Sequence, residues 1–92
     1  MYGLDDVFER MTPARVRVAA GLAALLSEPE IAEELGITYA GVRSIVRQLK
    51  EVTGERDVRG IGRFWQLHSE AWLTWCAAQG RVRIREREVP GE

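Results

Sequence analysis

Three polar residues near the middle of the chain have the types and the spacing needed to recognise a nucleic-acid base. Arg43, Ser44 and Arg47 fall on the polar side of a segment with helical periodicity. An arginine guanidinium group presents two donors that match the two acceptors of guanine in the major groove of DNA. The pattern therefore predicts contacts from these three side chains to base edges.

Further polar residues around this segment suit contacts with phosphates, which hold a protein in register on a duplex. We expect such contacts from Thr38, Tyr39, Gln48, Lys50 and Arg56. The alternative interpretation is that all of these side chains form an ordinary solvated helix face.

The positive charge is concentrated in one region, although the formal net charge of the chain is −1. Residues 41–63 hold six basic and three acidic residues, whereas residues 1–40 hold three basic and seven acidic ones. A local basic patch is what contact with phosphates requires, whatever the total charge. Four of the acids form an acidic patch, which is either a solvated face or a contact for a basic partner such as RNA polymerase: Glu28, Glu30, Glu33 and Glu34.

No residue set for catalysis or metal binding is visible. His68 is the only histidine and Cys76 the only cysteine, so the usual ligand spacings for zinc and any internal disulfide are excluded. We therefore expect neither an enzyme nor a cofactor. The acidic N-terminus is not that of a signal peptide, and no apolar run approaches the ~20 residues of a membrane helix, so we expect a cytoplasmic protein.

Two helices joined by a tight turn are predicted for residues 28–52. Ser27 and Glu30 have the spacing of a capping box, which marks the start of a helix. Gly36 easily takes the left-handed conformation that ends a helix, and Thr38 can cap the next one. This arrangement predicts a helix-turn-helix.

The second of these helices, residues 38–52, is amphipathic. Its apolar residues recur at i, i+3, i+4 and i+7 and are Val42, Ile45, Val46 and Leu49. One face should therefore pack on a core, which leaves the polar face free to enter a major groove.

Two helices are expected before this pair, one from Leu4 to Met11 that lays Phe8 on the core, and one from Pro13 to about Leu26. Thr12 is a good N-cap, and proline is favoured in the first turn. The expected buried stripe of the second helix is Val16, Ala19, Ala20, Ala23 and Leu26.

A final helix is predicted over about 58–79, with Asp57 as its cap. Its apolar residues form two stripes, of which one holds Ile61, His68 and the tryptophans Trp65, Trp72 and Trp75, and the neighbouring one Phe64, Leu67, Ala71 and Ala78. A helix that is apolar over so much of its circumference needs a second partner. We expect this partner to be another copy of the chain, with Trp65, Trp72 and Trp75 at the dimer interface. The alternative is that all three tryptophans lie in the core of one chain.

A winged arrangement is a rival prediction for the same region. It makes residues 55–67 a β-hairpin that turns at 60–62, because two glycines stand there, and it leaves a shorter helix capped by Ser69. After Gly80, residues 81–89 alternate basic and apolar types, which favours a short strand. This arm, 81–92, could touch phosphates or pair with a partner chain; from Glu86 onward its composition is typical of a solvated tail.

Residues from Met11 to Asp57 resemble the LuxR/GerE-type helix-turn-helix domains of bacterial transcription regulators. The matching positions are Thr12, Pro13, Ser27, Glu30, Ile31, Ala32, Leu35, Gly36, Ile37, Thr38, Val42, Arg43, Gly54 and Asp57. The resemblance implies a mainly α-helical fold of four to five helices, base contacts at Arg43, Ser44 and Arg47, and a homodimer formed by the last helix. Four positions depart from the family pattern: Arg15, Leu25, Gly41 and Ile45.

These observations predict that residues 1–92 form one helix-turn-helix domain that binds double-stranded DNA in a sequence-specific way and regulates transcription. The net acidity, the helix-weakening Gly41 and the tryptophan-rich last helix motivate an alternative, a protein-binding adaptor or inhibitor that uses the motif as a scaffold.

Overall fold

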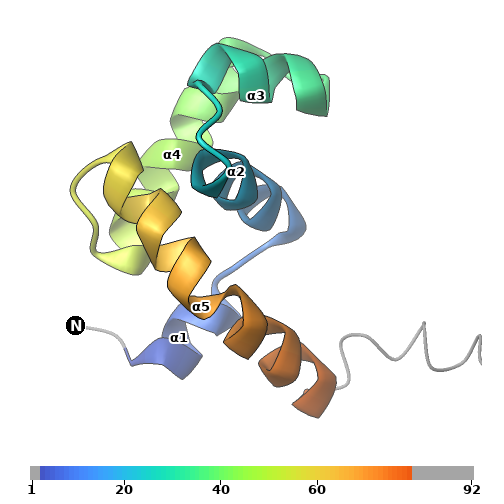
Figure 1. Cartoon of the computed structure of the whole chain (residues 1–92), viewed down its shortest axis with the longest axis vertical. Coiled ribbons are helices and arrows are strands. Elements are labelled where there is room, and N and C mark those ends of the chain that lie inside the picture. Colours follow the sequence, from blue (N-terminus) through green and yellow to red (C-terminus); the bar gives the residue numbers. More distant parts are fainter. Residues whose placement is uncertain (1–2, 80–92) are drawn as a thin grey trace, which may run out of the picture.

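The computed structural model describes residues 3–79, which form five helices and contain no strand (Figure 1). The helices are α1 (Leu4–Glu9), α2 (Pro13–Ala23), α3 (Glu28–Leu35), α4 (Tyr39–Thr53) and α5 (Val58–Ala78). The mainly helical fold is therefore confirmed. The strand or arm predicted for 81–92 lies outside the described residues.

Four of the helices begin at the residues that the sequence predicted as caps. The side-chain oxygen accepts a hydrogen bond from a first-turn amide at 3.2 Å for Thr12, 3.2 Å for Ser27, 2.9 Å for Thr38 and 2.8 Å for Asp57. Glu30 completes the capping box, because its carboxylate accepts from the Ser27 amide at 2.8 Å. These bonds satisfy amide donors that a helix start leaves without partners.

Left-handed glycines end the two middle helices. Gly36 has φ 70° directly after α3, and Gly54 has φ 79° directly after α4. Only three residues separate α3 from α4, so the direction of α4 is fixed by the Gly36 turn and by the Thr38 cap.

The core forms around α2, which packs against α3, α4 and α5 (Figure 1). The inward face of α4 agrees with the predicted stripe, because Val42, Val46 and Leu49 are buried and Ile45 is partly buried. The amphipathic pattern therefore gave the correct orientation of α4.

The predicted buried stripe of α2 is partly wrong. Ala20 is exposed, whereas Val18 and Leu22 lie in the core together with Ala19. The physical reason is that α2 has neighbours on several sides, so their positions, and not a single periodic stripe, decide which of its residues are buried.

The helix predicted over about 58–79 is confirmed, and the rival hairpin at 55–67 is wrong, because α5 is continuous from Val58 to Ala78. Its glycines serve close packing. A Cβ at Gly62 would lie 2.9 Å from the Leu22 carbonyl oxygen, and a Cβ at Gly60 would collide with the Glu55 carboxylate. Gly62 thus permits a close approach of α5 to the backbone of α2, which no larger residue allows.

The three tryptophans of α5 pack within the chain. Trp65 is buried in the core, so the prediction that its side chain forms a dimer contact is wrong. Trp72 and Trp75 are half-buried, with ring centroids 5.7 Å and 5.9 Å from that of Phe8. Phe8 is only 2% exposed, as predicted, and thereby anchors α1 on α5.

Candidate nucleic-acid interface

The outward face of α4 carries the residues that the sequence assigned to base contacts. Arg43 and Arg47 are exposed, and Ser44 is half-buried between them. Lys50 and Tyr39 are exposed on the same helix. Because the opposite face of α4 is packed into the core, these side chains project from a helix that is held in place.

Three cations surround a small polar hollow on this face. The hollow has a volume of about 170 Å³ and is lined by Glu28, Arg43, Val46, Arg47 and Lys50. An anion of the size of a phosphate group that enters it would meet three positive charges and one negative charge. The local field therefore favours an anionic ligand.

Intramolecular contacts hold Arg43 only loosely. Its Nε atom lies 3.9 Å from Glu28 Oε1, and the side chain of Arg43 remains 59% exposed. Its guanidinium carbon lies 5.8 Å from the centre of the Tyr39 ring. An exposed ion pair of this length contributes little stability, so Arg43 can exchange Glu28 for another acceptor at small cost.

Two of the residues assigned to phosphate contacts already have partners inside the chain. The Thr38 hydroxyl accepts the cap hydrogen bond from Gly41. Gln48 is half-buried, and its side-chain oxygen accepts hydrogen bonds from Arg15 Nε and Nη2, both at 3.1 Å. The main role of Gln48 in the structure is thus to join α4 to α2.

Arg15 joins three parts of the chain. Its guanidinium group donates to the Gln48 side-chain oxygen and, through Nη1, to the Arg10 carbonyl oxygen at 2.6 Å. Arg15 therefore bridges the start of α2, the segment before it and α4.

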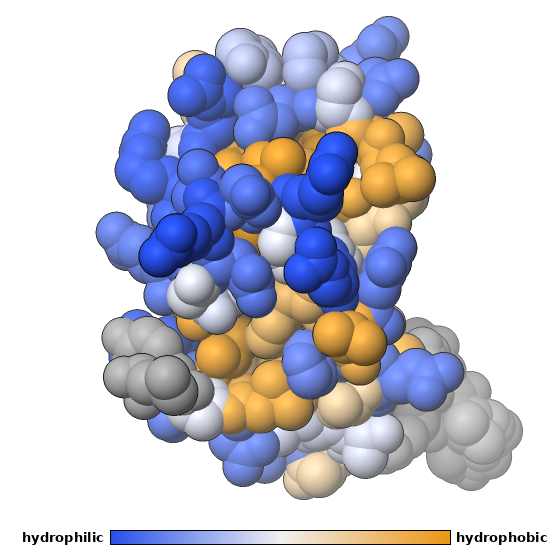
Figure 2. All heavy atoms as spheres, turned by 60° about the vertical axis from the view of Figure 1, so that its left-hand side comes forward, coloured by the Kyte–Doolittle hydropathy of each residue, from blue (hydrophilic) through white to orange (hydrophobic). Residues whose placement is uncertain are grey.

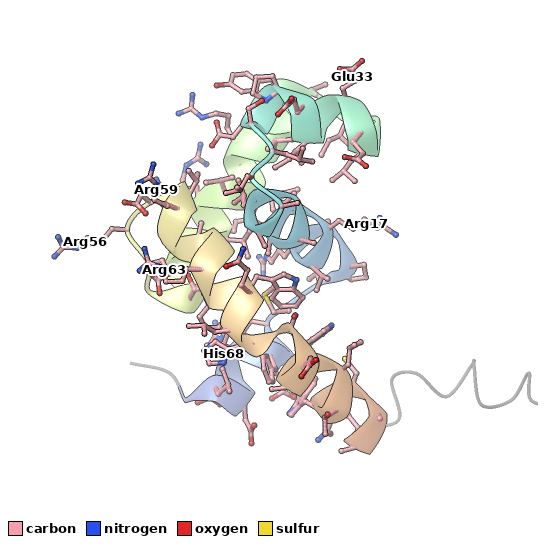
Figure 3. The ribbon with its side chains drawn as sticks, viewed as in Figure 1. Arg17, Glu33, Arg56, Arg59, Arg63 and His68 are labelled. Atoms are coloured by element: carbon pink, nitrogen blue, oxygen red, sulfur yellow. The ribbon has the colours of Figure 1, made fainter. Side chains whose placement is uncertain are left out.

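A second basic group follows α4. Arg56, Arg59 and Arg63 are all exposed, and they project from one side of the molecule, whereas Arg17 projects from the opposite side (Figure 3). The two acids of the same loop point at the backbone of α5: Asp57 accepts from the Gly60 amide, and the Glu55 carboxylate lies against Gly60. The sequence assigned Arg56 but gave no role to Arg59 or Arg63, although both contribute to the charge of residues 41–63.

The view that brings this side forward shows mainly hydrophilic side chains over its upper half and apolar patches lower down (Figure 2). The basic group of Arg56, Arg59 and Arg63, which lies on this side, thus belongs to a largely polar surface. In residues 3–79, no group of His, Cys, Asp and Glu side chains is arranged to hold a metal ion. None of the helices in this range is both long and apolar enough to cross a membrane.

Comparisons with protein-family models, with curated proteins and with solved structures found no match. The residues and their arrangement are therefore the basis for a proposed function.

Proposed function

We propose that this chain is a sequence-specific DNA-binding protein that regulates transcription by placing the outward face of α4 in the major groove. The observation that carries the proposal is the combination of Arg43, Arg47 and Lys50 around one hollow on a helix whose other face is buried. In this arrangement, Arg43, Ser44 and Arg47 contact base edges.

Contacts with phosphates set the register of this complex. Tyr39 and Lys50 flank the base-reading residues on α4, and Arg56 extends the basic surface beyond its C-terminal end. Thr38 and Gln48 contribute less than the sequence suggested, because their oxygen atoms already accept hydrogen bonds within the chain.

We further propose that the protein binds DNA as a homodimer joined through the second apolar stripe of α5. Phe64, the first residue of this stripe, packs against the core, whereas Leu67 is 70% exposed and Ala71 and Ala78 are also exposed. The part of the stripe from Leu67 onward is therefore open to a partner. Small residues beside a leucine allow two helices to approach closely. A two-fold dimer presents two α4 helices to half-sites about 34 Å apart.

The exposed leucines of α5 also support the alternative of a protein-binding adaptor. Leu67 and Leu73 are 70% and 57% exposed, and large exposed apolar side chains on one helix favour a protein contact. Binding of DNA by the chain would support the first function, and binding of a protein without DNA would support the adaptor.

The test begins with selection of a duplex from random oligonucleotides. We expect the double variant Arg43→Ala and Arg47→Ala to bind the selected duplex at least about 30-fold more weakly, because each bidentate base contact is worth about 1–3 kcal/mol. Arg17→Ala is the matched control, since Arg17 is exposed on the opposite side of the molecule. Selection of no sequence, or equal binding by the double variant, would remove the base-reading role.

A further inference from the structure

The second basic group, formed by Arg56, Arg59 and Arg63, is not used by the fold. All three side chains are exposed, and Figure 3 shows them on one side of the molecule. Within residues 3–79, none of them takes part in an ion pair or in a side-chain hydrogen bond. Their charges are therefore available to a ligand in solution.

The acidic residues around this group are engaged elsewhere or lie further along the helix. Asp57 caps α5, with its carboxylate oxygen 2.8 Å from the Gly60 amide nitrogen, and the Glu55 carboxylate lies against Gly60. The next acid on α5 is Glu70, two turns beyond Arg63. Positive charge is therefore in excess over this part of the surface, which favours an anionic ligand.

Two of the three cations are unfavourable for α5 itself. Arg59 lies in the first turn of α5, which contains no acid, and the helix dipole disfavours a cation at that end. Arg59 and Arg63 are four residues apart, so two like charges lie on one side of the helix and repel each other. Glutamine forms a helix about as well as arginine does and avoids both costs. Arginines that oppose the formation of their own helix point to a partner outside the chain.

We infer that Arg59 and Arg63, together with Arg56, hold the phosphate backbone of duplex DNA beside the groove that α4 enters. The inference rests on the proposed DNA binding, because it assigns a second contact to the same complex. The planar guanidinium group of arginine donates two parallel hydrogen bonds to a phosphate. Four residues of a helix rise about 6 Å, and the phosphates of one strand follow one another every 3.4 Å or about that along the duplex axis, so Arg59 and Arg63 contact different phosphates.

Arg56 connects this contact with α4. It is the second residue after Gly54, where α4 ends, and it stands three residues before Arg59. The helices α4 and α5 pack against each other, which fixes their cationic surfaces relative to one another. Phosphates carry no sequence information, so the second basic group supplies affinity and register and leaves the choice of sequence to α4.

The dependence of DNA affinity on salt concentration measures this contact. Each phosphate contact contributes about 0.9 to the slope of the logarithm of the association constant against the logarithm of the salt concentration. We expect the double variant Arg59→Gln and Arg63→Gln to have a slope that is shallower by about 1.8. Between about 50 and 200 mM salt, the unchanged chain should therefore lose about twelvefold more affinity than the double variant.

Arg17→Gln is the matched control for the loss of one positive charge, since Arg17 is exposed on the opposite side of the molecule (Figure 3). Arg59→Gln and Arg63→Gln as single variants should each lower the slope by about 0.9. Arg17→Gln should leave the slope unchanged. A control that lowers the slope as much as the single variants do would show an effect of net charge alone and would overturn the inference.

Titrations with the selected duplex and with a random-sequence duplex separate this contact from base reading by α4. The double variant of Arg59 and Arg63 should weaken both complexes by the same factor, so that the ratio of the two affinities stays the same. Arg43→Ala and Arg47→Ala should instead lower that ratio. An unchanged slope, or a changed ratio, in the double variant overturns the inference and leaves the proposal for α4 intact. A ratio near one for the unchanged chain, together with the expected loss of slope, removes base reading and leaves the phosphate contact standing.

Urea unfolding at low salt shows whether the variants fold. Arg59→Gln should have the same or a slightly higher midpoint than the unchanged chain, because it removes a cation from the first turn of α5. A lower midpoint would show that Arg59 serves the fold, and it would overturn the inference.

Discussion

The two longest helices, α4 and α5, expose surfaces of different kinds. The outward face of α4 holds Arg43, Arg47 and Lys50, whereas the outward face of α5 changes along its length from exposed Arg59 and Arg63 to exposed Leu67. A charged face gains little from contact with another apolar helix, and an apolar stripe gains little from phosphates. On this difference rests our proposal that α4 contacts DNA and that the later part of α5 contacts protein.

The largest expected effect is a loss of unfolding free energy, and it should occur on the buried face of α4 but not on its exposed face. Leu49→Ala should lower the free energy of unfolding by about 2–5 kcal/mol, because Leu49 is fully buried and its removal leaves a cavity. Arg47→Ala should change it by no more than about 0.5 kcal/mol, because Arg47 is exposed. Urea unfolding measures both. A large loss from Arg47→Ala would show that this side chain holds the fold together, which contradicts its role as a free reading residue.

A second effect tests why α5 contains glycine. Gly62→Ala should cost about 1–3 kcal/mol of unfolding free energy, because the added Cβ would lie 2.9 Å from a backbone oxygen of α2 that cannot move aside alone. Arg63→Ala, one residue further along and exposed, is the control and should leave the urea midpoint nearly unchanged. If Gly62→Ala is as stable as the control, α2 and α5 do not approach as closely as described.

The sequence was most informative where local chemistry decides the structure. Thr12, Ser27, Thr38 and Asp57 were each recognisable as caps, because their oxygen atoms meet amides only three residues away. The orientation of α4 also followed from its own pattern, since one face is continuously apolar.

Features that depend on neighbouring helices could not be predicted in this way. The packing role of Gly62 was not predicted, and the two glycines instead motivated the rival hairpin, because nothing in the local sequence shows that the α2 backbone lies against Gly62. Trp65 was assigned to a dimer contact because the pattern of α5 has two apolar stripes and does not say which one is covered. The bond from Arg15 to Gln48 joins residues 33 positions apart, so no local motif indicates it.

A third effect concerns the apolar stripe on α5. Leu67→Ser should weaken self-association about tenfold, or about 1.4 kcal/mol, while the urea midpoint measured at low concentration stays the same, because Leu67 is exposed in the single chain. Sedimentation over a range of concentrations measures the change. A chain that stays monomeric at high concentration would contradict dimer formation, and unchanged association in Leu67→Ser would place the interface elsewhere.

The smallest effect concerns the cap before α3, which supports the start of the α3–α4 pair. Ser27→Ala should cost about 1 kcal/mol of unfolding free energy. The hydrogen bonds from the Ser27 amide and hydroxyl lower the pKa of Glu30 below its ordinary value of 4.5. A lowered folded-state pKa means that Glu30 contributes its full stability at neutral pH and loses it as the pH falls through 4.5 and below.

Urea midpoints between pH 7 and pH 3 measure this contribution. The unchanged chain should lose more stability over that range than Ser27→Ala does, because the variant keeps the Ser27 amide contact but lacks the hydroxyl, the second cause of the lowered pKa of Glu30. Parallel curves for the two proteins would show that the capping box does not depend on the charge of Glu30.

The most direct test of DNA binding by α4 is an NMR titration of the isotope-labelled full chain with a duplex selected from random oligonucleotides. We expect the largest shift changes at the backbone amides of residues 39–50 and at the side chains of Arg43 and Arg47, with smaller changes near Arg56. Shift changes confined to the apolar stripe of α5, or no changes at saturating duplex, would contradict the assignment of α4 as the surface that reads DNA.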